Sequence, residues 1–156
     1  MSQPRERIPV GSNYINALGG ATYNFAYLEW GIICLHETIH RGFLIKSKNL
    51  TAGQIAKSFL QAVERLAPSD HDKAALEDLA TSFDELVVDR NRLMHGNPFT
   101  ASGGEQRLAY DGKHGRKDWT PALIDEFSDE LAKNSIEAGR ILHGGRYAAW
   151  KREVSN

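Results

Sequence analysis

The sequence predicts an all-α protein, an up-and-down four-helix bundle with a small loop or β-hairpin inserted before the last long helix. Three observations lead to this prediction. Apolar residues recur every three or four positions through four segments, helix-capping residues bound those segments, and residues 97–119 contain several glycines and lack the helical period. The 156 residues, 41% of them hydrophobic, are enough to form one core. We therefore expect a single domain spanning residues 1–156.

The first expected helix begins near Ser12 and ends near Gly42, after a flexible N-terminus of residues 1–11. Gly19 and Gly20 lie inside it and weaken it by roughly 1 kcal/mol each, so the pattern fits one long helix or two shorter ones. The apolar positions that predict this helix are Tyr14, Leu18, Ala21, Phe25, Leu28, Ile32, Leu35 and Ile39.

The second expected helix covers residues 51–67 and ends before Pro68. Thr51 and Gln54 have the spacing of a capping box, in which each side chain bonds to the backbone N–H of the other residue. The apolar face of this helix is formed by Ile55, Phe59, Leu60, Val63 and Leu66.

The third expected helix starts with Ser69 or Asp70 as its cap and ends at His95. Gly96 can adopt the left-handed conformation that often follows a helix, and Pro98 cannot continue one. The helix therefore has a well-marked C-terminal end.

The insert of residues 97–119 is predicted to hold a hairpin that pairs Gln106–Tyr110 with Arg116–Trp119. The fourth helix then begins with Thr120 as its cap and Pro121 in its first turn. It ends at Gly144-Gly145, and we expect residues 146–156 to form a C-terminal tail with at most a loose final turn.

Composition limits the possible functions. A net charge of −1 argues against a nucleic-acid binder whose whole surface is basic, so any anion site must be local. No apolar run is long enough for a membrane span and no signal peptide is evident, so we expect a cytoplasmic protein with no membrane partner.

The single cysteine, Cys34, excludes an internal disulfide, and we expect it to be a packed thiol. Trp30 is expected to complete the core.

Arg90 interrupts the apolar pattern of the third helix. Leu76, Leu79, Phe83 and Leu86 form the apolar stripe, and the next position of that spacing is Arg90. A guanidinium cannot be deprotonated, so its burial requires a carboxylate or a phosphate as partner. His95, five residues further on, is a group that titrates near neutral pH.

The run Arg90-Asn91-x-x-x-His95-Gly96, on the third helix of such a bundle, resembles the signature of the HEPN superfamily. These small all-helical proteins occur in prokaryotic toxin and antiviral defence systems. The resemblance covers most of residues 12–143. It implies metal-independent cleavage of RNA, no cofactor, and a homodimer in which two copies of the motif form one composite cleft. It also implies a neighbouring antitoxin or regulatory protein as a possible partner.

The residue types suit this chemistry. Cleavage by the ribose 2′-hydroxyl needs a group that transfers protons, which His95 can supply, and a fixed cation for the phosphate, which Arg90 can supply. Asn91 lies four residues before His95 and can orient the ring or the phosphate. Arg90 points about 140° away from His95 on an ideal helix. A dimer, or a relaxed last turn, would bring the two to a common phosphate.

Further residues are candidates for support. Asn24 and Glu29 are polar positions on the first helix, where HEPN proteins often carry them, and Arg92 adjoins the motif. The basic residues of the insert that could guide an RNA backbone are Arg107, Lys113, Arg116 and Lys117. Some HEPN toxins carry a tyrosine two residues after the histidine, which their antitoxin modifies by nucleotidyl transfer. Asn97 at that place argues against this mode of control.

Two alternatives stay open. In the first, Arg90 pairs with Glu29 or another buried carboxylate, His95 caps its helix, and the protein is a non-catalytic binding or assembly module. In the second, His36-Glu37-Thr38-Ile39-His40 is the His-Glu-x-x-His motif of a zinc metallopeptidase, with Glu64 or His71 as third ligand. The simpler interpretation of that motif is that both histidines border the buried face of the first helix.

Overall fold

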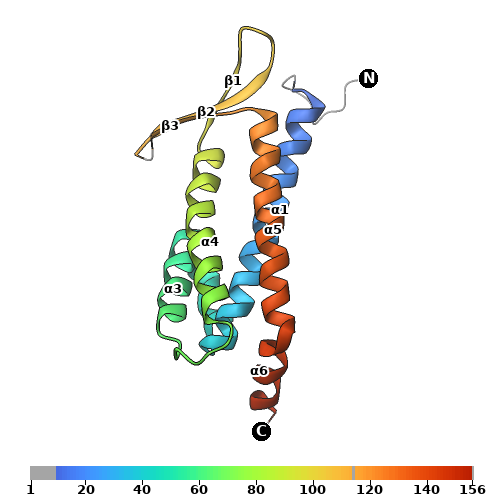
Figure 1. Ribbon diagram of the computed structural model, residues 1–156. Helices are drawn as coiled ribbons and strands as arrows, with labels where there is room; N and C mark the ends of the chain where they lie inside the picture. Colours follow the sequence, from blue (N-terminus) through green and yellow to red (C-terminus); the bar gives the residue numbers. More distant parts are fainter. Residues whose placement is uncertain (1–9, 114, 156) are drawn as a thin grey trace.

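The computed structural model describes residues 10–113 and 115–155, so residues 1–9 of the expected flexible N-terminus lie outside the described residues. The described chain is mostly helical and carries a small three-stranded antiparallel sheet (Figure 1). In chain order the elements are α1 (Ser12–Ile39), α2 (Phe43–Lys46), the 3-10 helix η1 (Ser47–Asn49), α3 (Ala52–Glu64), α4 (Lys73–Met94), β1 (Asn97–Thr100), β2 (Gln106–Gly112), β3 (Gly115–Trp119), α5 (Pro121–Ile141), the π-helical turn η2 (Leu142–Arg146) and α6 (Tyr147–Val154).

The first helix is continuous, and its glycines allow close packing against α5. α1 passes through Gly19 and Gly20 without a break. A Cβ atom at Gly20 would lie 3.7 Å from the Ser128 hydroxyl, and one at Gly31 would lie 3.4 Å from the Cβ of Ala138. Small residues on α1 therefore set the distance between α1 and α5.

α1 and α5 run in the same direction. Asn24 of α1 bonds to Ser128 of α5, and Thr38 near the end of α1 bonds to Arg146 just beyond the end of α5. Residue numbers therefore rise together along the two helices, as Figure 1 also shows. A strict up-and-down order would make the first and last long helices antiparallel, so that part of the prediction is wrong.

The parallel arrangement arises because the chain reverses direction once more between residues 43 and 50, where the sequence predicts no helix or strand. The Glu37 carboxylate accepts a bond from the backbone N–H of Leu44, which holds α2 beside the last turns of α1. After α2 and η1, α3 starts again in the direction of α1 (Figure 1). α4 then runs the opposite way, since Lys73 at its start donates to the carbonyl of Glu64 at the end of α3.

The caps of α3 and α4 follow the prediction in one case and not in the other. Thr51 and Gln54 form the expected capping box, with N···O distances of 3.3 and 2.9 Å. α4 begins only at Lys73, and neither Ser69 nor Asp70 is its cap. The Asp70 carboxylate instead accepts a hydrogen bond from the backbone N–H of Asp72 and pairs with Arg146. It therefore stabilises the loop before α4.

The insert is a sheet in the order β1-β2-β3. The predicted hairpin is confirmed, with Leu108 opposite Trp119 and Tyr110 opposite Lys117. The sequence does not predict β1, because its Pro98 lacks a backbone N–H and indicates only the end of the preceding helix. β1 is an edge strand, where a proline is tolerated because one side of the strand needs no partner.

Gly96 has a different role from the one expected. It does not adopt the left-handed conformation. A Cβ atom at this position would lie 3.0 Å from the Cβ of Leu108, closer than side chains normally pack. Gly96 therefore lets β2 approach the C-terminal end of α4 directly.

The C-terminal segment is helical rather than a loose turn. Thr120 caps α5 as expected, accepting a bond from the backbone N–H of Leu123. Past Ile141 the chain continues through η2 into α6, with Gly145 at a φ of 140° allowing the change of axis. Arg146 connects this region to the start of α4 through ion pairs of 3.0 Å with Asp70 and 3.3 Å with Asp72.

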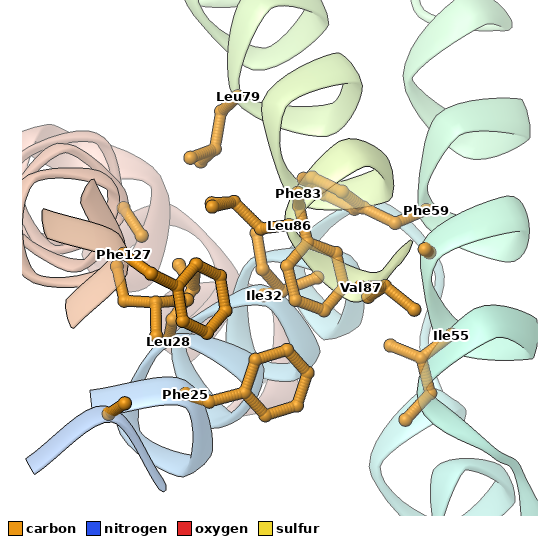
Figure 2. Packing of buried hydrophobic residues seen from close by; sticks show 14 of the residues in the cluster. Phe25, Leu28, Ile32, Ile55, Phe59, Leu79, Phe83, Leu86, Val87 and Phe127 are labelled. Atoms are coloured by element: carbon orange, nitrogen blue, oxygen red, sulfur yellow. The ribbon is translucent and has the colours of Figure 1, made fainter. Parts of the chain in front are cut away.

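The core lies between α1, α3, α4 and α5. Figure 2 shows the Phe25 and Phe83 rings facing one another, with centroids 6.1 Å apart, beside Leu28 and Ile32. Each such buried side chain contributes about 1.5–3 kcal/mol to folding. Burial raises the pKa of the Cys34 thiol, and Glu37 adds to the rise, as a packed thiol requires. Trp30 was expected in the core but is 56% exposed on α1.

Among the described residues, no helix combines the length and the apolar character needed to cross a membrane.

Candidate functional site

Arg90 lies on the side of α4 that faces α1. Its guanidinium carbon is 5.3 Å from the centroid of the Phe25 ring, a cation–π distance. One guanidinium nitrogen donates to the side-chain oxygen of Asn91 at 3.1 Å. The aromatic face accounts for a charged side chain at a position that the apolar stripe of α4 assigns to a hydrophobe.

A small pocket of about 130 Å³ opens beside Arg90. Glu29 lines it from α1. Burial raises the pKa of the Glu29 carboxyl, and the positive charge of Arg90 partly offsets this rise. Most of the other lining residues are apolar, among them Phe25, Leu93, Met94 and Phe127.

Within the described part of the chain, no carboxylate lies within 4.0 Å of the Arg90 guanidinium. Glu29 is near enough for its pKa to be affected but forms no ion pair with Arg90. The fold thus supports this cation with a ring face and one amide oxygen. Its positive charge is not matched by a direct negative contact.

His95 stands apart from Arg90 within one chain. It is the C-cap residue of α4, its backbone N–H donates to the Asn91 carbonyl at 3.0 Å, and its side chain is exposed. The pocket beside Arg90 is lined by Met94 and not by His95. The structure therefore brings Arg90 and Asn91 into contact and leaves His95 at the surface near the start of β1.

Of the three supporting candidates, one lies at the pocket of Arg90 and two lie away from it. Glu29 shares the pocket of Arg90, whereas Asn24 donates to the Ser128 hydroxyl at 2.9 Å and connects α1 to α5. Arg92 forms an ion pair of 3.0 Å with Asp89. Asn24 and Arg92 thus have structural contacts of their own.

The basic residues of the insert are mostly matched by carboxylates. Arg107 pairs with Glu105 at 2.6 Å and Arg116 with Asp118 at 3.4 Å. Lys113 is exposed at the end of the β2–β3 hairpin. The fourth residue, Lys117, has a separate role.

Lys117 connects the sheet to α4. Its ammonium group lies 3.1 Å from an Asp89 carboxylate oxygen and 3.9 Å from the centroid of the Trp119 ring. Arg92 reaches the same carboxylate oxygen. A carboxylate of α4 therefore holds β3 through Lys117, beside the helix end that carries the motif.

The His-Glu-x-x-His segment is engaged in folding contacts. The His36 ring stacks on Phe43 with centroids 3.6 Å apart, and its Nε2 lies 3.0 Å from the Ser58 hydroxyl. The Glu37 carboxylate accepts the backbone N–H of Gly42 at 3.1 Å and of Leu44 at 2.8 Å. A glutamate that anchors α2 in this way is not placed as a general base.

The third zinc ligand is also missing. Where the structure describes the chain, the one group of three potential ligands with atoms within 4.8 Å of each other is Asp70, His71 and Asp72. It contains neither histidine of the motif, and Arg146 pairs with both of its aspartates. Neither Glu64 nor His71 joins His36 and His40 in a cluster.

Sequence reasoning missed Phe25 as a site residue. It assigned Phe25 to the core stripe of α1, which the structure confirms, since this side chain is 5% exposed. The position of Arg90 could have predicted such a partner, because a cation on the apolar stripe of α4 must contact the apolar stripe of a neighbouring helix. An aromatic residue is the member of that stripe that can accept a cation.

Comparison with protein-family models, with curated proteins and with solved structures finds no match for this chain.

Proposed function

We propose that the protein is a metal-independent endoribonuclease of a prokaryotic toxin or antiviral defence system, acting in the cytoplasm as a HEPN-like homodimer. The observation that carries this proposal is the state of Arg90. It is a half-buried cation beside an open pocket, held by Phe25 and Asn91, with no carboxylate in direct contact. A phosphate is the anion that such a site can accept.

The chemistry assigns one task to each residue. The ribose 2′-oxygen attacks the adjacent phosphorus, the bond to the 5′-oxygen breaks, and a 2′,3′-cyclic phosphate forms. Arg90 stabilises the charge on the phosphate oxygens, and Asn91 fixes the guanidinium through its 3.1 Å bond. His95 transfers the proton between the two ribose oxygens and the solvent. None of these steps requires a metal ion.

A second copy of the chain would supply the histidine that the pocket lacks. Tyr23, Tyr27 and Trp30 lie one helical turn apart on α1 and are 56–68% exposed. This aromatic stripe borders Ala26 and Glu29, which line the pocket of Arg90. We propose a dimer that covers this stripe, which would bury a large apolar area, and in which His95 of each protomer approaches Arg90 of the other.

The decisive experiment is an RNA cleavage assay in EDTA. Arg90→Ala should lower the rate by about 10²–10³-fold and His95→Ala by about 10²–10⁴-fold, with the dimer still folded. Exposed residues of the same types, Arg152→Ala and His71→Ala, are the matched controls and should retain the full rate. Equal cleavage by all four variants would place the activity elsewhere.

Mixing the two inactive variants tests the composite site. In a symmetric dimer with crossed sites, a heterodimer of Arg90→Ala and His95→Ala keeps one intact site, so the mixture should recover about a quarter of the wild-type rate. No recovery would place Arg90 and His95 of one chain in the same site. A folded dimer that cleaves no RNA at any concentration would support the non-catalytic module instead.

A further inference from the structure

A second pocket is lined by residues from the last turns of α1 and from α2 and α3. The last turns of α1 lie at the end of the molecule away from the sheet (Figure 1). Its volume is about 440 Å³, within the range of small-molecule sites. Its polar lining is His36, His40, Lys46, Ser58, Gln61 and Arg65. The proposed ribonuclease chemistry uses none of these residues.

The lining of this pocket is positively charged and contains no acidic residue. For the residues that the structure describes, no carboxylate lies within 4.0 Å of His40, Lys46 or Arg65. Two other basic residues of this end are paired, Arg41 with Glu153 and Arg146 with Asp70. Lys46 and Arg65 therefore bring positive charge to one pocket of a protein whose net charge is −1.

The acidic residues nearest in sequence, Glu37 and Glu64, do not line the pocket. Glu37 lies between His36 and His40 on α1, but its two carboxylate oxygens accept the backbone N–H groups of Gly42 and Leu44. The fold therefore uses this charge to hold α2 in place. α2 in turn carries Lys46 to the pocket.

One wall of the pocket is formed by the His36 ring and the residues that hold it. The His36 ring is held between Phe43, with which it is parallel to within 4°, and the Ser58 hydroxyl. The His40 ring lies 6.3 Å from it. Burial lowers the pKa of His36, and the nearby charges of His40 and Lys46 lower it further, so His36 faces this cluster as a neutral side chain.

We propose that this pocket binds a small phosphomonoester, with Lys46 and Arg65 contacting the phosphate and Ser58 and Gln61 supplying neutral hydrogen bonds. A dianion matches the two permanent positive charges. The volume exceeds what one inorganic phosphate fills, which leaves room for an organic group between α1 and α3. The site is separate from Arg90 and His95, and binding there does not depend on RNA cleavage.

Titration calorimetry with two probes, inorganic phosphate and adenosine 5′-monophosphate, tests the proposal on the full chain. The double variant Lys46→Gln/Arg65→Gln should bind both probes at least tenfold more weakly. Lys48→Gln/Lys57→Gln is the matched control, since these exposed lysines belong to the same region but do not line the pocket. The control should bind as the wild type does.

The relative affinities for the two probes show whether the pocket recognises a phosphomonoester or the phosphate group alone. Tighter binding of the nucleotide than of phosphate supports the phosphomonoester, and equal binding supports a site for the phosphate group alone. The proposal is overturned if neither probe binds at millimolar concentration, or if the control variant loses as much affinity as the pocket variant. Thermal unfolding without ligand shows whether the variants are folded, and Lys46→Arg, which keeps the charge, should retain binding.

Discussion

The ends of α1 and α4 carry similar polar side chains, but the fold uses them differently. At the end of α1, the His36 ring bonds to Ser58 and the Glu37 carboxylate bonds to two backbone N–H groups. At the end of α4, Arg90 contacts a ring face and one amide, and His95 is exposed. The first motif matches a known catalytic pattern by spacing, yet its glutamate is committed to structure.

The difference shows how a motif match can be tested against a structure. A buried polar atom whose partners all lie in its own chain is explained by folding, because leaving it unsatisfied would cost about 1–3 kcal/mol. A half-buried cation without an anion is not explained in that way. By this criterion Arg90 is a stronger candidate for ligand contact than Glu37.

The largest expected effect is on stability at the end of α1. Glu37→Ala removes the acceptor of two backbone N–H groups from a side chain that is 8% exposed. The free energy of unfolding should fall by about 2–4 kcal/mol, measured by urea denaturation. His40→Ala, at an exposed position of the same motif, should change it by less than about 0.5 kcal/mol.

The same measurement addresses the zinc interpretation. If the segment only supports the fold, EDTA should leave the midpoint of unfolding unchanged in the wild type, and added zinc should not raise it. A zinc-dependent rise that His40→Ala abolishes would contradict the structural role assigned to the motif.

Much of the fold could be predicted from the sequence, because the relevant signals are local. The Thr51 capping box, the start of α5 at Thr120 and the β2–β3 hairpin follow from neighbouring residues. The direction of α3 could not be predicted, since it depends on the carboxylate of Glu37 holding α2 across a turn. Nor could the helical tail, because its Arg146 depends on an aspartate pair far away in the sequence.

The candidate site, too, could be predicted only in part from the sequence. The stripe of α4 identified Arg90 as unusual, and the structure shows its contact with Phe25. Asn24 is a site candidate through the HEPN resemblance and Lys117 through its charge, but their partners, Ser128 and Asp89, give them structural contacts. Residue type indicates what a side chain can do, whereas the packing of other elements decides whether it is already engaged.

A second prediction concerns the packing that supports the end of α4. Gly96→Ala places a Cβ atom 3.0 Å from that of Leu108, so β2 or the helix end must move. We expect a loss of about 1–3 kcal/mol in the free energy of unfolding. Gly139→Ala is the control, because an added methyl group there meets no atom within 4 Å, and it should stabilise α5 by up to about 1 kcal/mol. Equal effects would mean that Gly96 is not a point of close approach.

A third prediction distinguishes structure from RNA contact at the insert. Lys117→Ala removes a partly buried ion pair with Asp89 and a cation–π contact with Trp119, and should lower the free energy of unfolding by about 1 kcal/mol. Lys113→Ala, at an exposed position, should leave stability unchanged. If Lys117→Ala instead weakens RNA binding without any loss of stability, Lys117 belongs to the substrate surface and not to the support of α4.

The smallest expected effect is a pH dependence of stability at the end of α1. Burial, reinforced by the charges of His40 and Lys46, lowers the pKa of His36 below its usual 6.5. The folded state then binds fewer protons at this ring than the unfolded state does. Its contribution to stability is present above pH 6.5 and is lost as the pH falls through the folded-state pKa. His36→Gln removes this titration, so urea midpoints measured from pH 7.5 down to pH 5.5 should decline less steeply than in the wild type. An equally steep decline in His36→Gln would contradict the role assigned to this buried ring.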